Sequence, residues 1–221
     1  MSWKRFYYTW KWRLKGFLNS QGGDTVTRAL ISTNIGVYFA WKLLNPRFMW
    51  DHFIMNEYNT LYRKRYYTIF TSAISHQDAV HLFFNMIGLW FFGRPIEAFI
   101  GGARLLGLYL TGAAGGFAAI YYKALNGRYR QQIPSVLGAS AATSAIFAYF
   151  VCGNPWQPVL FFFVPMPAIV AGLVIFLLGA RGHDGYISHT GHLGGAVAGA
   201  HARIGRASCN LGGGGRPVRR R

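Results

Sequence analysis

The chain has 221 residues, of which 52% are hydrophobic and 13% are charged, and its formal net charge is +17. Soluble domains usually carry about 25% charged residues. Here the charges gather at the ends and between apolar runs, which indicates a polytopic membrane protein. A strongly basic chain also suggests nucleic-acid binding, but these Lys and Arg residues flank apolar segments and form no single stripe. We therefore expect them to meet anionic lipid headgroups and to set the topology, with no nucleic-acid partner.

The first 28 residues are basic and aromatic, and their first acid is Asp24. They lack the apolar core of a secretory signal. Two interpretations stay open. One is a mitochondrial targeting segment, and the other is a membrane-surface helix whose aromatic side chains lie among the headgroups. At the other end, residues 205–221 form a basic tail rich in Gly and Arg. Because both ends are basic, we expect them on one side of the membrane, which requires an even number of spans.

The region between these ends is predicted to be an all-α membrane domain over residues 29–204. Six apolar segments are expected to span the bilayer as a bundle, at residues 29–44, 80–100, 105–122, 137–152, 168–180 and 185–202. Residues 47–75 mix aromatic and charged side chains, and we expect this long first loop to be an amphipathic insertion lying partly in the bilayer. Residues 159–167 contain Val-Pro-Met-Pro, which argues against an uninterrupted helix.

The sixth segment is the least hydrophobic, because it contains Ser188, His189, Thr190 and His192. Such a segment must face other helices and not lipid. His192, Gly195 and Gly199 are spaced i, i+3 and i+7, so they share one helix face on which a partner backbone can approach closely. The fourth segment, rich in Ala, is the expected partner.

Ser140 lies within that fourth segment, two residues after Gly138. A serine in a membrane helix often only bonds to a helix carbonyl or lies at a packing contact. Next to a neutral imidazole, however, it is the minimum for an activated nucleophile. Asp184 lies eight residues before His192, at the membrane edge, so the sequence favours a Ser/His dyad over a triad.

His81 and Asn85 are spaced i, i+4, which puts an imidazole and a carboxamide on one helix face. Both can donate hydrogen bonds to a developing oxyanion. The alternative is a structural pair that bonds the long loop to the bundle. No metal or cofactor is expected: no carboxylate or thiol completes a ligand set with His183, His189, His192 and His201. Cys152 and Cys209 show no metal or redox spacing.

Together these motifs resemble the rhomboid family of intramembrane serine proteases, from about residue 29 to residue 203. Gly138-Ala139-Ser140 is similar to the Gly-x-Ser nucleophile motif of that family, and His192 to Gly199 are similar to its His-x-x-Gly-x-x-x-Gly sixth helix. The His81 to Asn85 stretch resembles its oxyanion motif, His-x-x-x-Asn. Further positions match at His76, Gly93, Glu97 and Gly101.

The resemblance implies that Ser140 and His192 cleave transmembrane protein substrates and that His81 and Asn85 stabilise the oxyanion. It also implies that the first loop and the Pro165/Pro167 break flank a lateral path for substrate. Short stretches look most like mitochondrial, plant-type members, which favours the mitochondrial inner membrane. They are Phe48-Met49, Ile74-Ser75-His76 and Asn85-Met86-Ile87-Gly88. The sequence predicts no oligomeric state.

Three positions depart from the family. Ala141 stands where a Gly usually follows the nucleophile, and Tyr67-Thr68 replace the Trp-Arg pair of the first loop. Ser144 replaces an aromatic that stacks on the histidine. These departures support an alternative, a catalytically inactive relative that binds membrane proteins for sorting or assembly. A channel or transporter is not favoured, because the spans offer little buried charge beyond Glu97.

Overall fold

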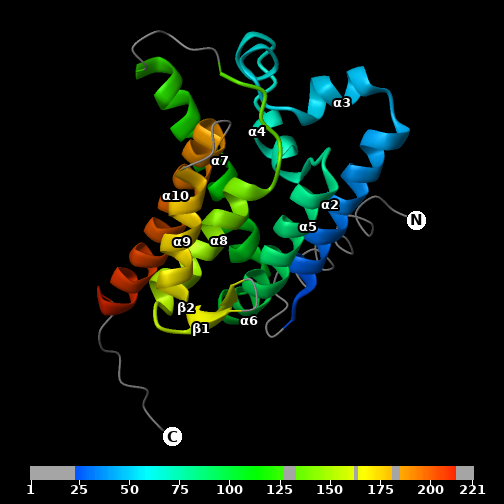
Figure 1. The fold of residues 1–221 in the computed structure, drawn as a ribbon. Coiled ribbons are helices and arrows are strands. Elements are labelled where there is room, and N and C mark those ends of the chain that lie inside the picture. The colour runs from blue at the N-terminus through cyan, green and yellow to red at the C-terminus, as the bar shows by residue number, and fades with distance from the viewer. Residues whose placement is uncertain (1–22, 127–132, 162–163, 181–184, 213–221) are drawn as a thin grey trace, which may run out of the picture.

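A computed structural model of the chain describes residues 23–126, 133–161, 164–180 and 185–212 (Figure 1). The targeting or surface segment expected over residues 1–28 lies almost wholly outside this range, as do His183 and Asp184.

The first half of the described chain contains one long helix and a series of short ones. Helix α2 spans Thr25–Leu43 and ends before Asn45-Pro46. The long first loop contains α3 (Pro46–Phe53), the π-helical turn η1 (Glu57–Tyr62), α4 (Thr68–Thr71) and the 3-10 turn η2 (Ser72–Ile74). The second apolar segment is continuous but not regular. It consists of α5 (Ala79–Gly88), the π-helical turn η3 (Leu89–Gly93) and α6 (Arg94–Ile100).

The second half contains four helices and a hairpin: α7 (Gly102–Asn126), α8 (Ser140–Gly153), β1 (Pro158–Phe161), β2 (Val164–Pro167), α9 (Ala168–Ala180) and α10 (Gly185–Gly212). The hairpin pairs Pro158 with Pro167 and Phe161 with Val164 in antiparallel register. The expected break before α9 is therefore confirmed, and the described chain is otherwise mostly helical, as the predicted all-α class requires. The prolines exclude a helix here, and the chain forms a short extended hairpin instead.

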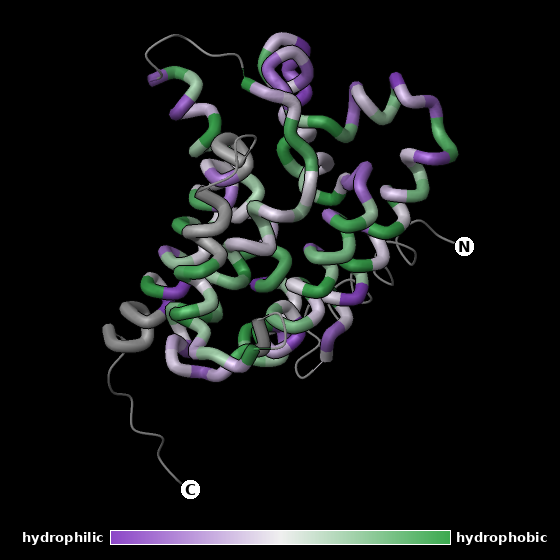
Figure 2. The backbone as a smooth tube through the Cα atoms, viewed as in Figure 1, coloured by the Kyte–Doolittle hydropathy of each residue, from purple (hydrophilic) through white to green (hydrophobic). Residues whose placement is uncertain are grey.

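Helix α7 is both long and apolar enough to cross a bilayer by length and composition, and α8 is a shorter apolar helix. No other helix in the described ranges passes the same test. Most of the other helices are too short: α9, for example, is strongly apolar but has only 13 residues. Hydrophobic and hydrophilic stretches alternate along the backbone (Figure 2). The chain is thus mostly helical with membrane-protein character, and the number of spans stays a prediction.

The larger of two buried clusters joins α2, α5, α7 and α8. Its largest fully buried members include Leu89, Leu105, Tyr109 and Ile146. A smaller cluster under the first loop joins Met55, Ile120, Ala124 and Ile133. The first loop is thus packed against α7 and the segment before α8.

Helix α10 packs against both α8 and α7, which also contact each other, and glycines make this close approach possible (Figure 1). A Cβ added at Gly195 would overlap the carbonyl oxygen of Ala141, and one added at Gly199 would overlap that of Ala145. On α7, a Cβ added at Gly115 would lie 2.8 Å from the carbonyl oxygen of Gly194. No larger side chain fits at these contacts without moving backbone.

The Glu97 side chain of α6 binds the N-terminus of α2. Its carboxylate is fully buried and accepts three hydrogen bonds from α2, from the backbone N–H groups of Val26 and Thr27 at 2.8 Å and from the Thr27 hydroxyl at 2.7 Å. The first N–H groups of a helix have no intrahelical acceptor, and a negative charge there is favourable. A residue of the second apolar segment therefore caps α2.

Candidate active site

Gly138 shapes the approach to Ser140. Its φ is +123°, in the region that favours glycine. A Cβ added there would also overlap the His81 ring. The Gly138 N–H donates to the Ser72 carbonyl at 2.9 Å, which ties this turn to the end of the first loop. The glycine therefore lets the chain turn sharply beneath an imidazole and begin α8 at Ser140.

His76 holds the residue before the serine. It lies in the loop that precedes α5, is fully buried, and its Nε2 accepts a hydrogen bond from the Ala139 N–H at 3.2 Å. Burial, with a smaller contribution from the neighbouring His81, lowers the pKa of His76 to about 4. At neutral pH the ring is uncharged and able to accept this bond. The resemblance to the family includes His76 but implies no role for it. The structure shows that His76 positions the backbone beside Ser140.

His81 and Asn85 lie one turn apart on α5, as their spacing predicts. The Asn85 Nδ2 donates to the His81 carbonyl at 2.9 Å, and its Oδ1 accepts from the Thr143 hydroxyl at 3.0 Å. The Thr143 hydroxyl lies 3.1 Å from the Ser140 carbonyl. Asn85 is thus bonded to α8 one turn after the serine. Thr143 was not singled out from sequence, although its i+3 position after Ser140 is a signal that could have found it.

A cavity of about 340 Å³ brings the predicted residues together. Ser140 from α8, His192 from α10 and His81 from α5 all border it, with Gly138 in its wall. Ser140 and His192 are both half-buried. Asn85 is not among the described residues that border the cavity, and Gly195 and Gly199 lie further along the contact between α10 and α8. The cavity thus combines a hydroxyl, two imidazoles and the start of a helix.

The first loop forms one wall of this cavity. Met55 and Val136 exchange backbone hydrogen bonds of 3.0 and 2.8 Å, and a Glu57 carboxylate oxygen accepts from the Ile133 N–H at 3.1 Å. The segment that leads into Ser140 is therefore paired with the first loop, and the pairing keeps the mouth of the cavity in place.

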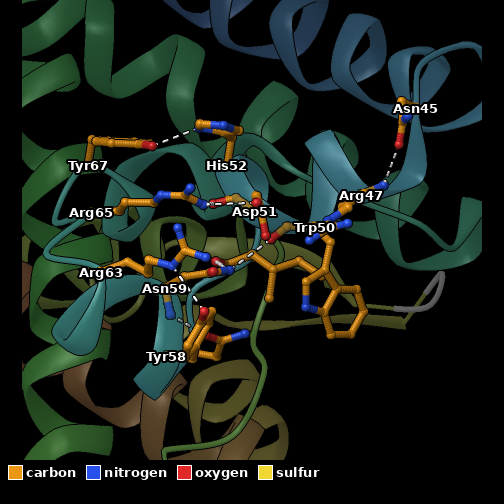
Figure 3. Close-up of polar contacts among 12 residues, drawn as sticks. Asn45, Arg47, Trp50, Asp51, His52, Tyr58, Asn59, Arg63, Arg65 and Tyr67 are labelled. Carbon is orange, nitrogen blue, oxygen red and sulfur yellow. Dashed lines mark hydrogen bonds and ion pairs between the residues drawn. The ribbon is translucent and has the colours of Figure 1, made fainter.

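Side-chain contacts hold the loop itself together (Figure 3). Arg65 donates to the Asp51 carbonyl at 2.8 Å and pairs with its carboxylate at 3.3 Å. His52 Nδ1 lies 2.7 Å from the Tyr67 hydroxyl, and the two rings stack. The buried Thr68 hydroxyl lies 2.8 Å from that of Thr60. Tyr67 and Thr68, which stand near the place of the expected Trp-Arg pair, thus make internal contacts of their own.

Comparison with known proteins identifies the family of the chain. The family model described as "Rhomboid domain" matches residues 63–207, more than half of the chain. The chain belongs to the rhomboid family. The resemblance found from the motifs is therefore confirmed.

Two relatives share much of the chain with this rhomboid. "RHOMBOID-like protein 12, mitochondrial" of Arabidopsis thaliana is 36% identical over 212 residues, covering 87% of this chain and 60% of the relative. "Rhomboid protein 1, mitochondrial" of Saccharomyces cerevisiae is 31% identical over 182 residues, covering 77% and 50%. The chain thus spans about 50–60% of the length of these two relatives.

Within this rhomboid, Ala141 is accommodated by a second small residue. A Cβ added at Gly116 of α7 would lie 2.6 Å from the Cβ of Ala141 and 3.0 Å from the carbonyl oxygen of Gly191. The methyl group that replaces the usual glycine therefore lies in space that α7 leaves open. Because α7 supplies this space, Ala141 is compatible with the close packing of α8 and α10.

Proposed function

We propose that this rhomboid is an intramembrane serine endopeptidase that cleaves transmembrane segments of membrane proteins with a Ser140/His192 dyad. The observation that carries the proposal is the shared cavity: Ser140, His192 and His81 border it from three different helices. Residues so far apart in sequence meet there in the combination that acyl transfer requires.

In the proposed reaction, the neutral His192 takes the proton of the Ser140 hydroxyl as its oxygen attacks a substrate carbonyl carbon. The tetrahedral intermediate then collapses, the C–N bond breaks, and His192 gives the proton to the leaving amine. Water next attacks the acyl ester while His192 takes one of its protons. The second tetrahedral intermediate collapses, the bond from the acyl carbon to the Ser140 oxygen breaks, and His192 returns the proton to that oxygen as the carboxyl product leaves. No carboxylate is assigned a role in this scheme.

The negative oxygen of the intermediate needs donors already in position. Ser140 is the first residue of α8, and a helix N-terminus favours negative charge. We assign the side-chain donors to His81, which borders the cavity, and to the second N–H of the Asn85 amide. The bonds from Asn85 to the His81 carbonyl and from Thr143 to Asn85 fix the orientation of that amide.

The membrane arrangement belongs to the same proposal. We propose six spans, formed by α2, α5 to α6, α7, α8, α9 and α10, within a membrane domain of residues 29–204 between a basic segment (1–28) and a basic tail (205–221). Anionic headgroups at the basic ends and transmembrane protein substrates are the proposed partners. Because both relatives carry "mitochondrial" in their names, we propose a mitochondrial location, in the inner membrane.

The second candidate function is an inactive rhomboid-like protein that binds membrane proteins for sorting or assembly. Ala141 after the nucleophile is the observation that favours it. The open space at Gly116 weakens this argument, because it removes the steric reason for inactivity. A binding protein would also have no need for a serine and two imidazoles around one cavity.

The test is cleavage of a panel of single-span substrates in liposomes. Wild type is compared with Ser140→Ala and His192→Ala, and Ser144→Ala serves as the control because it removes a hydroxyl from the same helix one turn away. Cleavage by wild type and Ser144→Ala that disappears in the other two variants supports the protease. Uncut substrate with folded wild type, while an active rhomboid cuts the same panel, would overturn it in favour of the binding role.

A further inference from the structure

The two peptide groups before Ser140 are both bound by one short segment. The Gly138 N–H donates to the Ser72 carbonyl at 2.9 Å, and the Ala139 N–H donates to His76 Nε2 at 3.2 Å. We call the residues from Ser72 to His76 the anchor segment. Its first residue is buried and its last is fully buried. The position of the serine at the start of α8 therefore depends on where the anchor segment lies.

The anchor segment is itself held by side chains of two further helices. The Tyr109 hydroxyl of α7 donates to the Ala73 carbonyl at 2.6 Å. Trp41, in the last turn of α2, donates from Nε1 to the Ser75 hydroxyl oxygen at 2.8 Å. Ala73 directly follows Ser72, so adjacent carbonyl groups accept from α7 and from the turn that precedes α8. Side chains of α7 and α2 thus fix the segment that fixes the serine.

The Tyr109 hydroxyl lies deep in the bundle, where a polar group needs a reason. Tyr109 is only 1% exposed, and Asn34 of α2, whose Nδ2 donates to the Tyr109 oxygen at 3.4 Å, is fully buried. Polar groups inside a membrane bundle are costly and mark functional positions. No step of the proposed reaction uses this pair, and neither Tyr109 nor Trp41 borders the cavity. A phenylalanine would pack in the same way, so what the hydroxyl adds is a directional bond to the anchor segment.

We propose that Tyr109 and Trp41 are positioning residues for Ser140, which act through the anchor segment. The proposal rests on the proposed protease function, because the position of the serine matters to the reaction only if the serine is the nucleophile. Misplacing a reacting group by about 1 Å can cost about 100-fold in rate. Loss of one bond to the anchor segment allows a smaller shift and should lower kcat by about threefold to tenfold. KM should stay unchanged, because substrate binds in a cavity that these two residues do not border.

The first measurement needs no cleavage. Hydrogen exchange is followed by mass spectrometry in the full chain in mixed micelles, in the peptide that contains the Gly138 and Ala139 amides. Tyr109→Phe keeps the ring and removes the hydroxyl, so these amides should exchange about threefold to tenfold faster. The matched control is Tyr149→Phe on α8. It removes the same atom from a ring that is 5% exposed and whose hydroxyl has no hydrogen-bond partner within the described residues, so exchange should stay within about twofold of wild type.

The second measurement is the kcat and KM for a single-span substrate in liposomes. Tyr109→Phe should lower kcat as above and keep KM within about twofold, while Tyr149→Phe should change neither. Trp41→Phe removes the Nε1 donor and Ser75→Ala removes its acceptor, so each should also lower kcat. Because the two substitutions remove the same bond, the double variant should be no slower than the slower single variant. Circular dichroism and gel filtration establish that each variant is folded, and the Trp41 and Ser75 variants keep the test open if Tyr109→Phe does not fold.

The outcomes separate anchoring from catalysis. Unchanged exchange of the two amides in Tyr109→Phe, or an equal rise in Tyr149→Phe, would overturn the anchoring. Faster exchange with an unchanged kcat, or a loss that falls on KM, would overturn the positioning role. Additive losses in the double variant would overturn the role of Trp41. A folded wild type that cleaves nothing would instead refute the protease, and the exchange comparison would still decide whether Tyr109 anchors the chain before Ser140.

Discussion

The contact between Ala141 and Gly116 permits a sharp test of how the serine is positioned. In Gly116→Ala, the new Cβ would lie 2.6 Å from the Cβ of Ala141 and 3.0 Å from the carbonyl oxygen of Gly191. Two carbon atoms pack at about 3.5 to 4.0 Å, so α7 and α8 must move apart by about 1 Å. Overpacking of this kind costs about 1–3 kcal/mol.

Ala141→Gly should rescue the variant, because it removes the methyl group that the new side chain meets. In the double variant only the approach to the Gly191 carbonyl remains, and a contact of 3.0 Å is relieved by a small shift. We expect the two substitutions to be coupled by about 1–2 kcal/mol, within the range for residues in direct contact. Because Ser140 adjoins Ala141, the single variant should also lose proteolytic activity and the double variant should regain it.

The assay is reversible unfolding in mixed micelles, with the free energy of unfolding measured for wild type, both single variants and the double variant. Gly107→Ala is the matched control on the same helix, because nothing lies within 4 Å of a Cβ added there. Its effect should stay within about 1 kcal/mol. If Gly116→Ala is no more harmful than Gly107→Ala, or if Ala141→Gly fails to restore stability, the proposed contact is refuted.

Three further predictions follow from the same structure. Glu97→Leu should lower the free energy of unfolding by about 2–4 kcal/mol, because it leaves two buried backbone N–H groups of α2 without an acceptor. Thr27→Val, which removes only the hydroxyl bond, should cost about 1 kcal/mol, and equal losses in the two variants would contradict the capping role. Thr143→Val should lower the free energy of unfolding by about 1 kcal/mol and reduce cleavage with no change in helix content, measured by circular dichroism; unchanged cleavage would show that Asn85 needs no support. Burial lowers the pKa of His76 from its usual 6.5 to about 4, so the unfolded chain binds a proton more readily than the folded one. The contribution of the neutral His76 to the free energy of unfolding should be complete above pH 6.5 and should be lost progressively as the pH falls towards 4. His76→Asn should flatten this decline in unfolding titrations between pH 7.5 and 4.5, and an unchanged slope would assign the decline to other groups.

The sequence predicted the bounds of helices well where a proline or glycine marks the end of an element. The span expected over residues 168–180 matches α9 in full, because Pro167 stops the preceding strand. The span expected over 137–152 begins at Ser140 instead, since the positive φ of Gly138 cannot continue a helix. Helix α10 continues to Gly212, ten residues beyond the expected end at residue 202, although Gly205 and Gly212 are poor helix formers.

Contacts between distant segments were harder to predict. Glu97 bonds to backbone N–H groups 70 and 71 residues earlier, and no side-chain pattern marks backbone donors. The space for the Ala141 methyl group depends on Gly116 of α7. The sequence does not indicate that these two residues are in contact, because the contact forms only when α7 and α8 pack together. The spacing rules could place His81 and Asn85 on one face, but the bond from Asn85 to Thr143 needed the structure.

The capping of α2 by Glu97 also has a consequence for biosynthesis. The ribosome makes the chain in order, at about 5–20 residues per second. Because Val26 and its acceptor are 71 residues apart, α2 exists for about 4 to 14 s before its cap has been made. Over that interval the N–H groups of its first turn lack the Glu97 carboxylate and must bond to water or to another acceptor. The N-terminal turn of α2 is therefore secured only after the helix itself has been made, but before α7 to α10 are synthesised.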